Sequence, residues 1–402
     1  MTPSILGADP LLSHGIDLEI VLIVIGKTVV IFALLLVLVM FYIWFMRKVI
    51  ADMQNRIGPA KAGPWGILQT LADGIKFFFK EQSIPDTADR TVFRLAPYLS
   101  VIPAFLAFSI IPIGGKVSIA GHQTYLQLAD PPIGVLFLLM MSGIGLYGVM
   151  LAGWASGSKY PLLGSVRASA QLLSYEAAFG LSIVAVLLHS GTLSTRSIAN
   201  AQAWTNWHSF ATDWYWSVAI VSFVIFVIAA VAETDHPPFD LVEAEQELVG
   251  GFHTEYTGIR FAIFFLAGFM NVITMSAIAV TLFLGGPSGP ALGFLPVHGV
   301  VNVWFMPIFW FFTKLMVLLF GTVWLRASLP RLRYDQLMDL GWKWLIELAF
   351  LAVMVTAVVV IAREQRWDRW IAVPAAFGGA IAILGLLRLC MPARDETVSE
   401  TI

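Results

Sequence analysis

Apolar residues along this chain gather into nine long runs, which cover residues 19–46, 94–114, 133–154, 161–189, 213–232, 260–285, 301–325, 344–362 and 370–391. A helix of about 20 residues crosses a hydrocarbon core of ~30 Å, and in lipid every backbone group must be bonded within its own segment. The pattern therefore predicts an all-α fold, a polytopic membrane helical bundle with about eight core transmembrane helices and an additional ninth. We expect residues 1–362 to form one membrane domain and residues 363–402 to add the ninth helix and a tail.

The segment 63–81, between the first two runs, repeats its apolar residues every three or four positions. The apolar set is Leu68, Leu71, Ala72, Ile75, Phe78 and Phe79, and the opposite face holds Gln69, Asp73, Lys76 and Lys80. This spacing predicts an amphipathic helix that lies in the membrane interface. A helix packed on partner subunits explains the same spacing equally well.

Composition agrees with a membrane protein, because the chain is 58% hydrophobic and 12% charged, whereas soluble chains are about 45–50% apolar and about 25% charged. The net charge of -2 gives no reason to expect a nucleic-acid partner. The single cysteine, Cys390, can form no intrachain disulfide and cannot hold an iron–sulfur cluster, which needs about four ligands. The first run is too long for a cleavable signal peptide.

Lys and Arg residues predict the orientation of the bundle. If the first run leads from outside to inside, 17 of them fall on the cytoplasmic side and 5 on the other, while Lys27 and Lys314 fall within runs. We therefore expect the N-terminus outside and the loop 233–256 in the cytoplasm. Lys27, near the outer end of the first run, is expected to extend its ammonium to the membrane surface.

The loop 233–256 is strongly acidic and contains no Lys or Arg up to residue 255. Asp240, Glu243 and Glu247 would share one face of a helix, and Glu245 would point away. Acids this close titrate together, and burial raises their pKa values, so a row of them could carry protons. A fully solvated acidic loop is the alternative, although apolar residues interleave with the acids. His236 and His253 beside these acids could bind metal, but solvated or hydrogen-bonded histidines are the simpler interpretation.

Two ionisable residues fall near the middle of predicted transmembrane helices, Glu176 in the fourth and Lys314 in the seventh. Such residues are costly in lipid and are candidates for a functional role. The alternative is a buried Glu–Lys pair that only orients two helices. The pattern G-x-G-x-x-G at 143–148 lies inside a membrane run, where it indicates close helix packing rather than a dinucleotide site.

Several stretches resemble the H subunit of bacterial NADH–quinone oxidoreductase, respiratory complex I, the counterpart of mitochondrial NADH dehydrogenase subunit 1. They are residues 232–256, Arg56-Ile-Gly-Pro59 with 72–76 and 80–81, 153–160 with Arg167, Gln171 and 174–176, and Arg326–Met338, which matches the loop after the seventh helix. The resemblance covers roughly residues 20–360. It implies a membrane subunit that forms part of the quinone entrance and couples quinone reduction to proton translocation.

By this resemblance, the proton-path positions are Glu176, Glu233, Asp240, Glu243, Glu245, Glu247 and Glu255, and we add Lys314 from its place in the bundle. The positions near the quinone entrance are Arg47, Arg56, Asp73, Phe265 and Arg326. The resemblance further implies that flavin and iron–sulfur clusters belong to partner subunits of the peripheral arm, with other membrane-arm subunits as neighbours. This chain is then expected to hold no cofactor or metal, to meet quinone as substrate, and to catalyse nothing alone, in a bacterial cell membrane.

The chain departs from the family pattern at several positions. Met46 and Gly268 stand where the family has glutamates, and His236 stands where it has an arginine. Glu347 in the eighth run could replace one missing acid. Two alternatives remain open from the sequence: the equivalent subunit of a related membrane-bound hydrogenase complex, and a stand-alone proton transporter.

Overall fold

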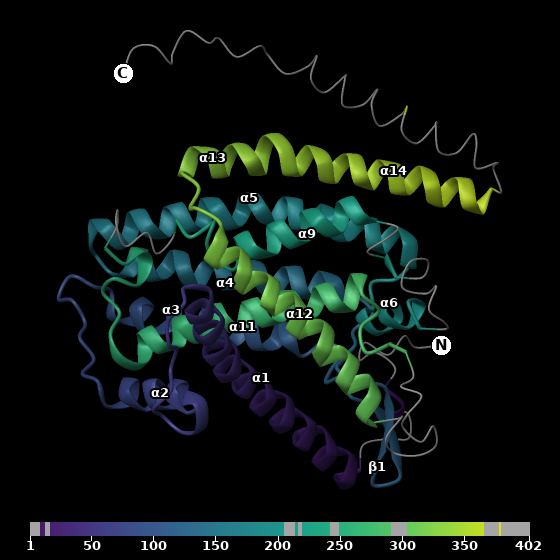
Figure 1. Cartoon of the computed structure of the whole chain (residues 1–402), viewed down its shortest axis with the longest axis horizontal. Helices are drawn as coiled ribbons and strands as arrows, with labels where there is room; N and C mark the ends of the chain where they lie inside the picture. Colours follow the sequence, from purple (N-terminus) through teal and green to yellow (C-terminus); the bar gives the residue numbers. More distant parts are fainter. Residues whose placement is uncertain are drawn as a thin grey trace.

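The computed structural model describes residues 9–12, 17–204, 214–215, 219–241, 249–290, 304–365 and 378. Within these ranges seven helical segments are long and apolar enough to cross a membrane, and α9 (Ile220–Glu233) is a shorter apolar helix. The long segments are α1 (Leu18–Met53), α3 (Arg90–Phe108), α4 (Gly134–Ala155), α5 (Lys159–Ser190), α11 (Gly258–Phe283), α12 (Met306–Ser328) and the segment Tyr334–Ala362. The predicted all-α bundle is therefore confirmed (Figure 1). The ninth run falls almost entirely outside the described residues.

The last described membrane segment begins earlier than the sequence predicts. It consists of α13 (Tyr334–Asp339), a π-helical turn η5 (Leu340–Leu345) and α14 (Ile346–Glu364). The connection after α12 consists only of residues 329–333, and it contains Pro330. Pro330 cannot continue a helix, and at the start of the next helix the Arg333 backbone N–H donates to the side-chain oxygen of Gln336 at 3.1 Å. The motif from Arg326 to Met338 thus comprises the end of α12, the connection 329–333 and most of α13.

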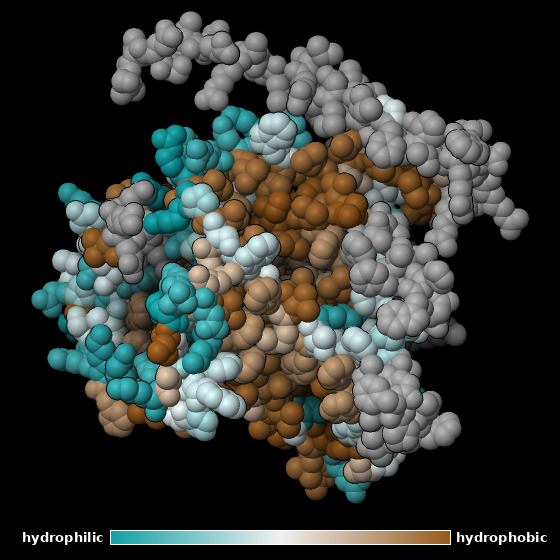
Figure 2. All heavy atoms as spheres, viewed as in Figure 1, coloured by the Kyte–Doolittle hydropathy of each residue, from teal (hydrophilic) through white to brown (hydrophobic). Residues whose placement is uncertain are grey.

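Helix α11 is the centre of the bundle. Every residue from Val272 to Phe283 is buried, so this half of α11 is surrounded on all sides by other parts of the bundle. In contrast, α1 exposes large apolar side chains such as Leu22 and Val29 along most of its length. Figure 2 shows apolar side chains over the middle of the molecule and hydrophilic ones gathered at the end where α2 lies, as expected for a lipid-facing bundle.

Small residues allow the closest helix contacts, as predicted for residues 143–148. A Cβ placed on Gly148 of α4 would lie 2.8 Å from the Ser100 nitrogen of α3. A Cβ on Gly164 of α5 would lie 2.8 Å from three backbone atoms of Gly251 and Phe252. These contacts bring α3, α4 and α5 together with Gly251 and Phe252 of the acidic turn (residues 234–256). They define walls of the candidate site.

The predicted amphipathic helix is α2 (Gln69–Phe79), preceded by the 3-10 turn η2 (Pro64–Gly66). Its side chain Asp73 turns towards α1, while Phe78 and Phe79 are 72% and 86% exposed. The apolar face is therefore largely uncovered by the rest of the described chain. That arrangement suits a helix in the membrane interface, and it suits a helix covered by a partner subunit as well.

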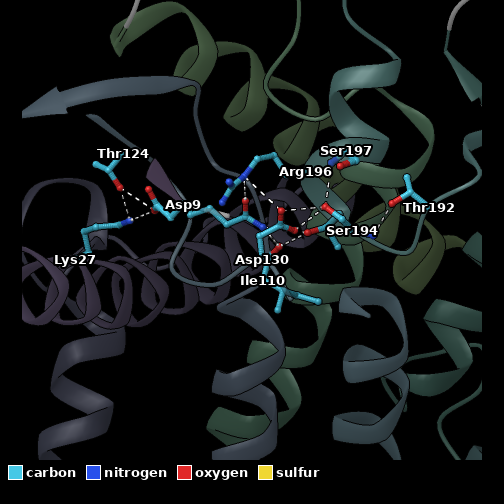
Figure 3. Close-up of polar contacts among 11 residues, drawn as sticks. Asp9, Lys27, Ile110, Thr124, Asp130, Thr192, Ser194, Arg196 and Ser197 are labelled. Carbon is cyan, nitrogen blue, oxygen red and sulfur yellow. Dashed lines mark hydrogen bonds and ion pairs between the residues drawn. The ribbon is translucent and has the colours of Figure 1, made fainter. Parts of the chain in front are cut away.

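A hairpin and a polar network close the opposite end of the bundle. The hairpin pairs β1 (Lys116–Ile119) with β2 (His122–Tyr125), and the nearby polar helix is α6 (Thr195–Ala201). Lys27 forms an ion pair within the protein, since its Nζ lies 2.9 Å from Thr124 Oγ1 and 3.3 Å from Asp9. Arg196 contacts Asp130 at 3.6 Å, and Ser194 also donates to Asp130 (Figure 3). The end of the bundle opposite α2 is therefore held by buried ion pairs.

Candidate functional site

Two carboxylates from different helices face one chamber in the middle of the bundle. The carboxylate chamber is a cavity of about 100 Å³ between α3, α4, α5, α9 and α11, and its polar lining includes Ser142, Glu176, Glu233 and Asp235. Glu233 is buried at the end of α9 and accepts a hydrogen bond from Ser142. Glu176 of α5 lines the same chamber beside Gly143 of α4, where a Cβ would lie 3.6 Å from a Glu176 carboxylate oxygen. Two carboxylates that share one chamber repel each other when both are ionised, so a proton between them is favourable.

The turn after α9 is held in place by hydrogen bonds from α5 and from the connection after α12. Gln171 of α5 is fully buried, and its Nε2 lies 3.0 Å from the Ala232 carbonyl, 3.2 Å from Asp235 and 2.9 Å from the Phe239 carbonyl. From the connection after α12, Leu332 donates to the Pro238 carbonyl at 3.1 Å, and Arg331 donates to the Asp240 carbonyl. Asp235 and Asp240 therefore belong to a part of the loop that is fixed to the bundle.

A second cavity adjoins the carboxylate chamber. The histidine chamber, also about 100 Å³, is lined by the polar residues Thr234, Asp235, His236, Asp240, His253 and Arg326 and by phenylalanines of α11 and of η3 (Gly251–His253). His236 packs edge-on against Phe269 at 5.6 Å, and Arg326 Nη1 lies 3.2 Å from the Met46 sulfur. The chamber thus combines a cation, neutral imidazoles and carboxylates in apolar surroundings.

Burial shifts the titration of the chamber's polar groups that lie outside the membrane helices. Burial lowers the pKa of His236 to about 4, and the nearby Arg326 charge adds to the effect. Burial also lowers the pKa of His253 to about 4, and it raises the pKa of Tyr256 above its ordinary value. Both histidines are therefore neutral at pH 7.

These histidines should make the acidic turn less stable in acid. Because an unfolded histidine has a pKa of about 6.5, the unfolded turn binds more protons than the folded turn between pH 6.5 and 4. Stability contributed by each neutral histidine is complete above pH 6.5 and is lost as the pH falls towards 4, up to about 3 kcal/mol per residue. Hydrogen exchange of residues 234–256, corrected for intrinsic rates, should show faster opening at pH 5 than at pH 7.5.

The matched variant carries His236→Gln and His253→Gln, which cannot titrate. Its opening free energy should change much less between the two pH values. As a control, His122→Gln changes a histidine of the β1–β2 hairpin at the other end of the bundle. The explanation fails if the double variant keeps the full pH dependence.

The third part of the site is an apolar groove of about 580 Å³ between α1, α2 and α11. Arg47 Nη1 lies 2.8 Å from Asp73 Oδ2, so an ion pair joins α1 to α2 at its edge. Gln69 also donates to Asp73 at 3.2 Å. Phe265 of α11 lies in the wall of this groove, which is otherwise lined almost entirely by aliphatic and aromatic side chains. Its shape and chemistry suit a long apolar ligand.

The three cavities are neighbours, because they share residues in their walls. The groove and the histidine chamber share Phe261 and Phe265. The two chambers share Asp235, Phe252 and Gly268, among others. The histidine chamber, with Arg326 and the histidines, therefore lies next to the apolar groove on one side and next to the chamber of Glu233 and Glu176 on the other.

Not all residues predicted from the sequence meet in these cavities. Glu255 lies between η3 and α11 and lines neither chamber, and Arg56 is exposed in the turn after α1, where it donates to Gln54 at 2.8 Å. Glu243, Glu245 and Glu247 lie outside the described residues. Their proposed place in a proton path therefore stays a prediction.

Lys314 is held at the far end of α11. Its Nζ lies 2.6, 2.9 and 2.6 Å from the carbonyl oxygens of Leu284, Gly286 and Ser288, and 4.2 Å from the ring centre of Trp214. Carbonyl oxygens at a helix C-terminus stabilise a cation, so these bonds account for the buried ammonium. A pair with Glu176 is not needed to explain its burial.

Sequence reasoning did not single out Ser142, Gln171 or Asp235 as site residues. Ser142 and Gln171 are polar residues within apolar runs, and Gln171 also belongs to a stretch that resembles the family. Asp235 lies in the acidic stretch 233–256. The buried amide of Gln171, fixing the acidic turn, is the most informative of them. Within the described ranges, no group of three or more His, Cys, Asp or Glu side chains is placed to hold a metal ion.

The two positions that lack the expected glutamates lie at the histidine chamber. Gly268 lines it, and Met46 contacts Arg326, which lines it. Met46 contacts Arg326, so the guanidinium meets a weak sulfur acceptor where a carboxylate would form an ion pair. Gly268 lies in the wall between the two chambers, and a Cβ there would meet nothing within 4 Å. The space for a side chain exists at this position although the side chain does not.

Comparison with known proteins assigns the chain to a family. A sequence model described as NADH dehydrogenase matches residues 26–357. The H subunit of NADH-quinone oxidoreductase from Frankia alni is 50% identical over 90% of this chain and 78% of its own length. The proteins of the same name from Frankia casuarinae and Streptomyces avermitilis are 48% and 45% identical, over 97% and 96% of this chain and 85% and 83% of their own lengths. The chain therefore belongs to the NADH dehydrogenase family, among the H subunits of NADH-quinone oxidoreductase.

Proposed function

We propose that this chain is the subunit of a membrane-bound NADH–quinone oxidoreductase that admits quinone and passes the energy of its reduction to buried carboxylates. The observation that carries the proposal is the sequence of adjoining cavities from the apolar groove to Glu233 and Glu176. An isoprenoid quinone has a long apolar tail, which suits the groove, and a polar head, which suits the region near Arg326.

In this proposal the buried acids hold and pass protons. Electron transfer to quinone changes the charge near the histidine chamber, and carboxylates in a low-dielectric cavity respond to a nearby charge by taking up or releasing a proton. Asp235 borders both chambers, so it lies between the histidine chamber and Glu233. In this proposal Glu243, Glu245 and Glu247 belong to the same path.

The partners follow from the same assignment. The relatives at 45–50% identity are named subunits of NADH-quinone oxidoreductase, which favours this complex over a hydrogenase or a stand-alone transporter. We propose that flavin and iron–sulfur subunits dock on the end that carries α2 and the acidic turn. The excess of Lys and Arg predicted on that side supports a cytoplasmic location for it.

The groove can be tested by filling it from Gly74 of α2, which borders the groove and has no atom within 4 Å of its Cβ position. In Gly74→Leu, the KM for a long-chain quinone should rise about 10-fold, since lost contacts worth about 1.4 kcal/mol change affinity by that factor. The KM is measured in membranes that contain the whole complex. Oxidation of NADH by an acceptor that draws electrons before quinone should not change.

The matched control is Gly26→Leu on α1, where the Cβ position is equally open but no groove residue is involved. Both variants replace a helical glycine with the same side chain, so general effects on helix stability cancel. An unchanged KM in Gly74→Leu would exclude the groove as the quinone route.

A further inference from the structure

His236 presents an acceptor atom to the histidine chamber. Its Nδ1 lies 2.6 Å from the Thr234 carbonyl oxygen, which can only accept, so Nδ1 carries the ring proton. The other nitrogen, Nε2, is then an acceptor. It is shielded from solvent, and it has no hydrogen-bond partner among the described residues. A buried polar atom without a partner costs free energy unless it meets a ligand or water.

The groups around His236 define what it can bind. Arg326 faces it from α12, Asp235 and Asp240 from its own turn, and His253 from η3. The α11 side of the chamber contributes phenylalanines and the open position Gly268. A cavity of about 100 Å³ with several polar groups is large enough for ordered water, which needs two to four polar partners.

We propose that His236 is a positioning residue that orients water between the apolar groove and the carboxylate chamber. It does so by accepting a hydrogen bond from the water at Nε2. This inference rests on the proposed function and names a residue through which that function acts. Arg326 has only donors, so water beside it must present its oxygen. His236 has only an acceptor to offer, so the same water presents a hydrogen towards it, and the water chain acquires one direction.

The imidazole must stay neutral for this role. Burial and the Arg326 charge, which lower its pKa to about 4, keep Nε2 unprotonated at the pH at which the complex works. A proton that passes along the water is therefore not trapped on the ring. A side chain with an acceptor oxygen could replace the imidazole, whereas an apolar one could not.

The test compares three variants in the assembled complex. His236→Leu and His236→Phe remove the acceptor, and the coupled rate of quinone reduction should fall about 10-fold, with a larger solvent isotope effect in D2O. His236→Gln keeps an acceptor oxygen, and its rate should stay within about 2-fold of the original. The amount of assembled complex and NADH oxidation by an artificial acceptor show that the variants are intact.

Full coupled rates in both apolar variants would overturn the inference, and so would a glutamine variant as slow as the apolar ones. Failure of the inference is distinguishable from failure of the proposed function. If Gly74→Leu raises the quinone KM while His236→Leu changes nothing, only the role of His236 is excluded. If Gly74→Leu has no effect, the groove itself is excluded whatever His236 does.

Discussion

Replacing Glu233 with glutamine is expected to reduce proton-coupled quinone reduction about 100-fold in the assembled complex, because a correctly placed proton donor or acceptor commonly contributes about 10²–10⁴ in rate. Glu233 is buried, and it lies in the chamber that also holds Glu176. Glutamine has the same shape and can still accept from Ser142, so the change removes the ionisable proton and little else. Proton translocation in sealed vesicles and quinone reduction should fall together.

Two comparisons sharpen this expectation. Glu176→Gln should have a similar effect, and the double variant should be scarcely slower than either single one, since residues that act as one unit are not additive. Glu347→Gln makes the same change in α14, at a residue that lines neither chamber, and should leave the rate nearly unchanged. Equal losses in Glu347→Gln and Glu233→Gln would mean that the carboxylate chamber has no special role.

Gly164→Val should prevent most of the protein from assembling. The new Cβ would lie 2.8 Å from the Cα and carbonyl carbon of Gly251 and from the Phe252 nitrogen. Backbone atoms cannot move aside as a flexible side chain can, so α5 must separate from η3 at a cost of about 3 kcal/mol. The displaced η3 also forms walls of both chambers through Phe252. The yield of assembled complex and its thermal midpoint measure the effect.

Gly180→Val provides a matched control on the same helix. A Cβ at Gly180 meets nothing within 4 Å, so the same side chain adds no clash there. Its yield and thermal midpoint should remain close to those of the original protein. A Gly164→Val complex that assembles normally would show that the close approach of α5 and η3 is not required.

The helices and the general region of the site could be predicted from sequence because both depend on local pattern. Apolar runs identify membrane helices, since lipid accepts few polar groups. The acidic stretch around Glu233 and Asp240 is equally visible, and the family resemblance is spread over most of the chain. Helix ends were less accurate, as α1 and the last described segment show, because helix geometry continues into polar residues beyond the hydrocarbon region.

Contacts between segments were harder to predict. The sequence placed Glu255 with the other acids and left open a pair between Lys314 and Glu176. In the fold, Glu255 lines neither chamber, and Lys314 binds three carbonyl oxygens at the end of α11. Periodicity tells which face of a helix is apolar, but it does not tell which faces of two helices meet.

By itself, the sequence determined that this protein is a helical membrane bundle of the NADH dehydrogenase type with an acidic turn beside it. Tertiary structure alone decided that Glu176 and Glu233 share a chamber, that Gln171 fixes the turn, and that His236 stands beside Arg326. The physical reason is that burial follows from the composition of each segment. The meeting of side chains distant in sequence depends instead on how small residues such as Gly164 and Gly148 let the helices pack.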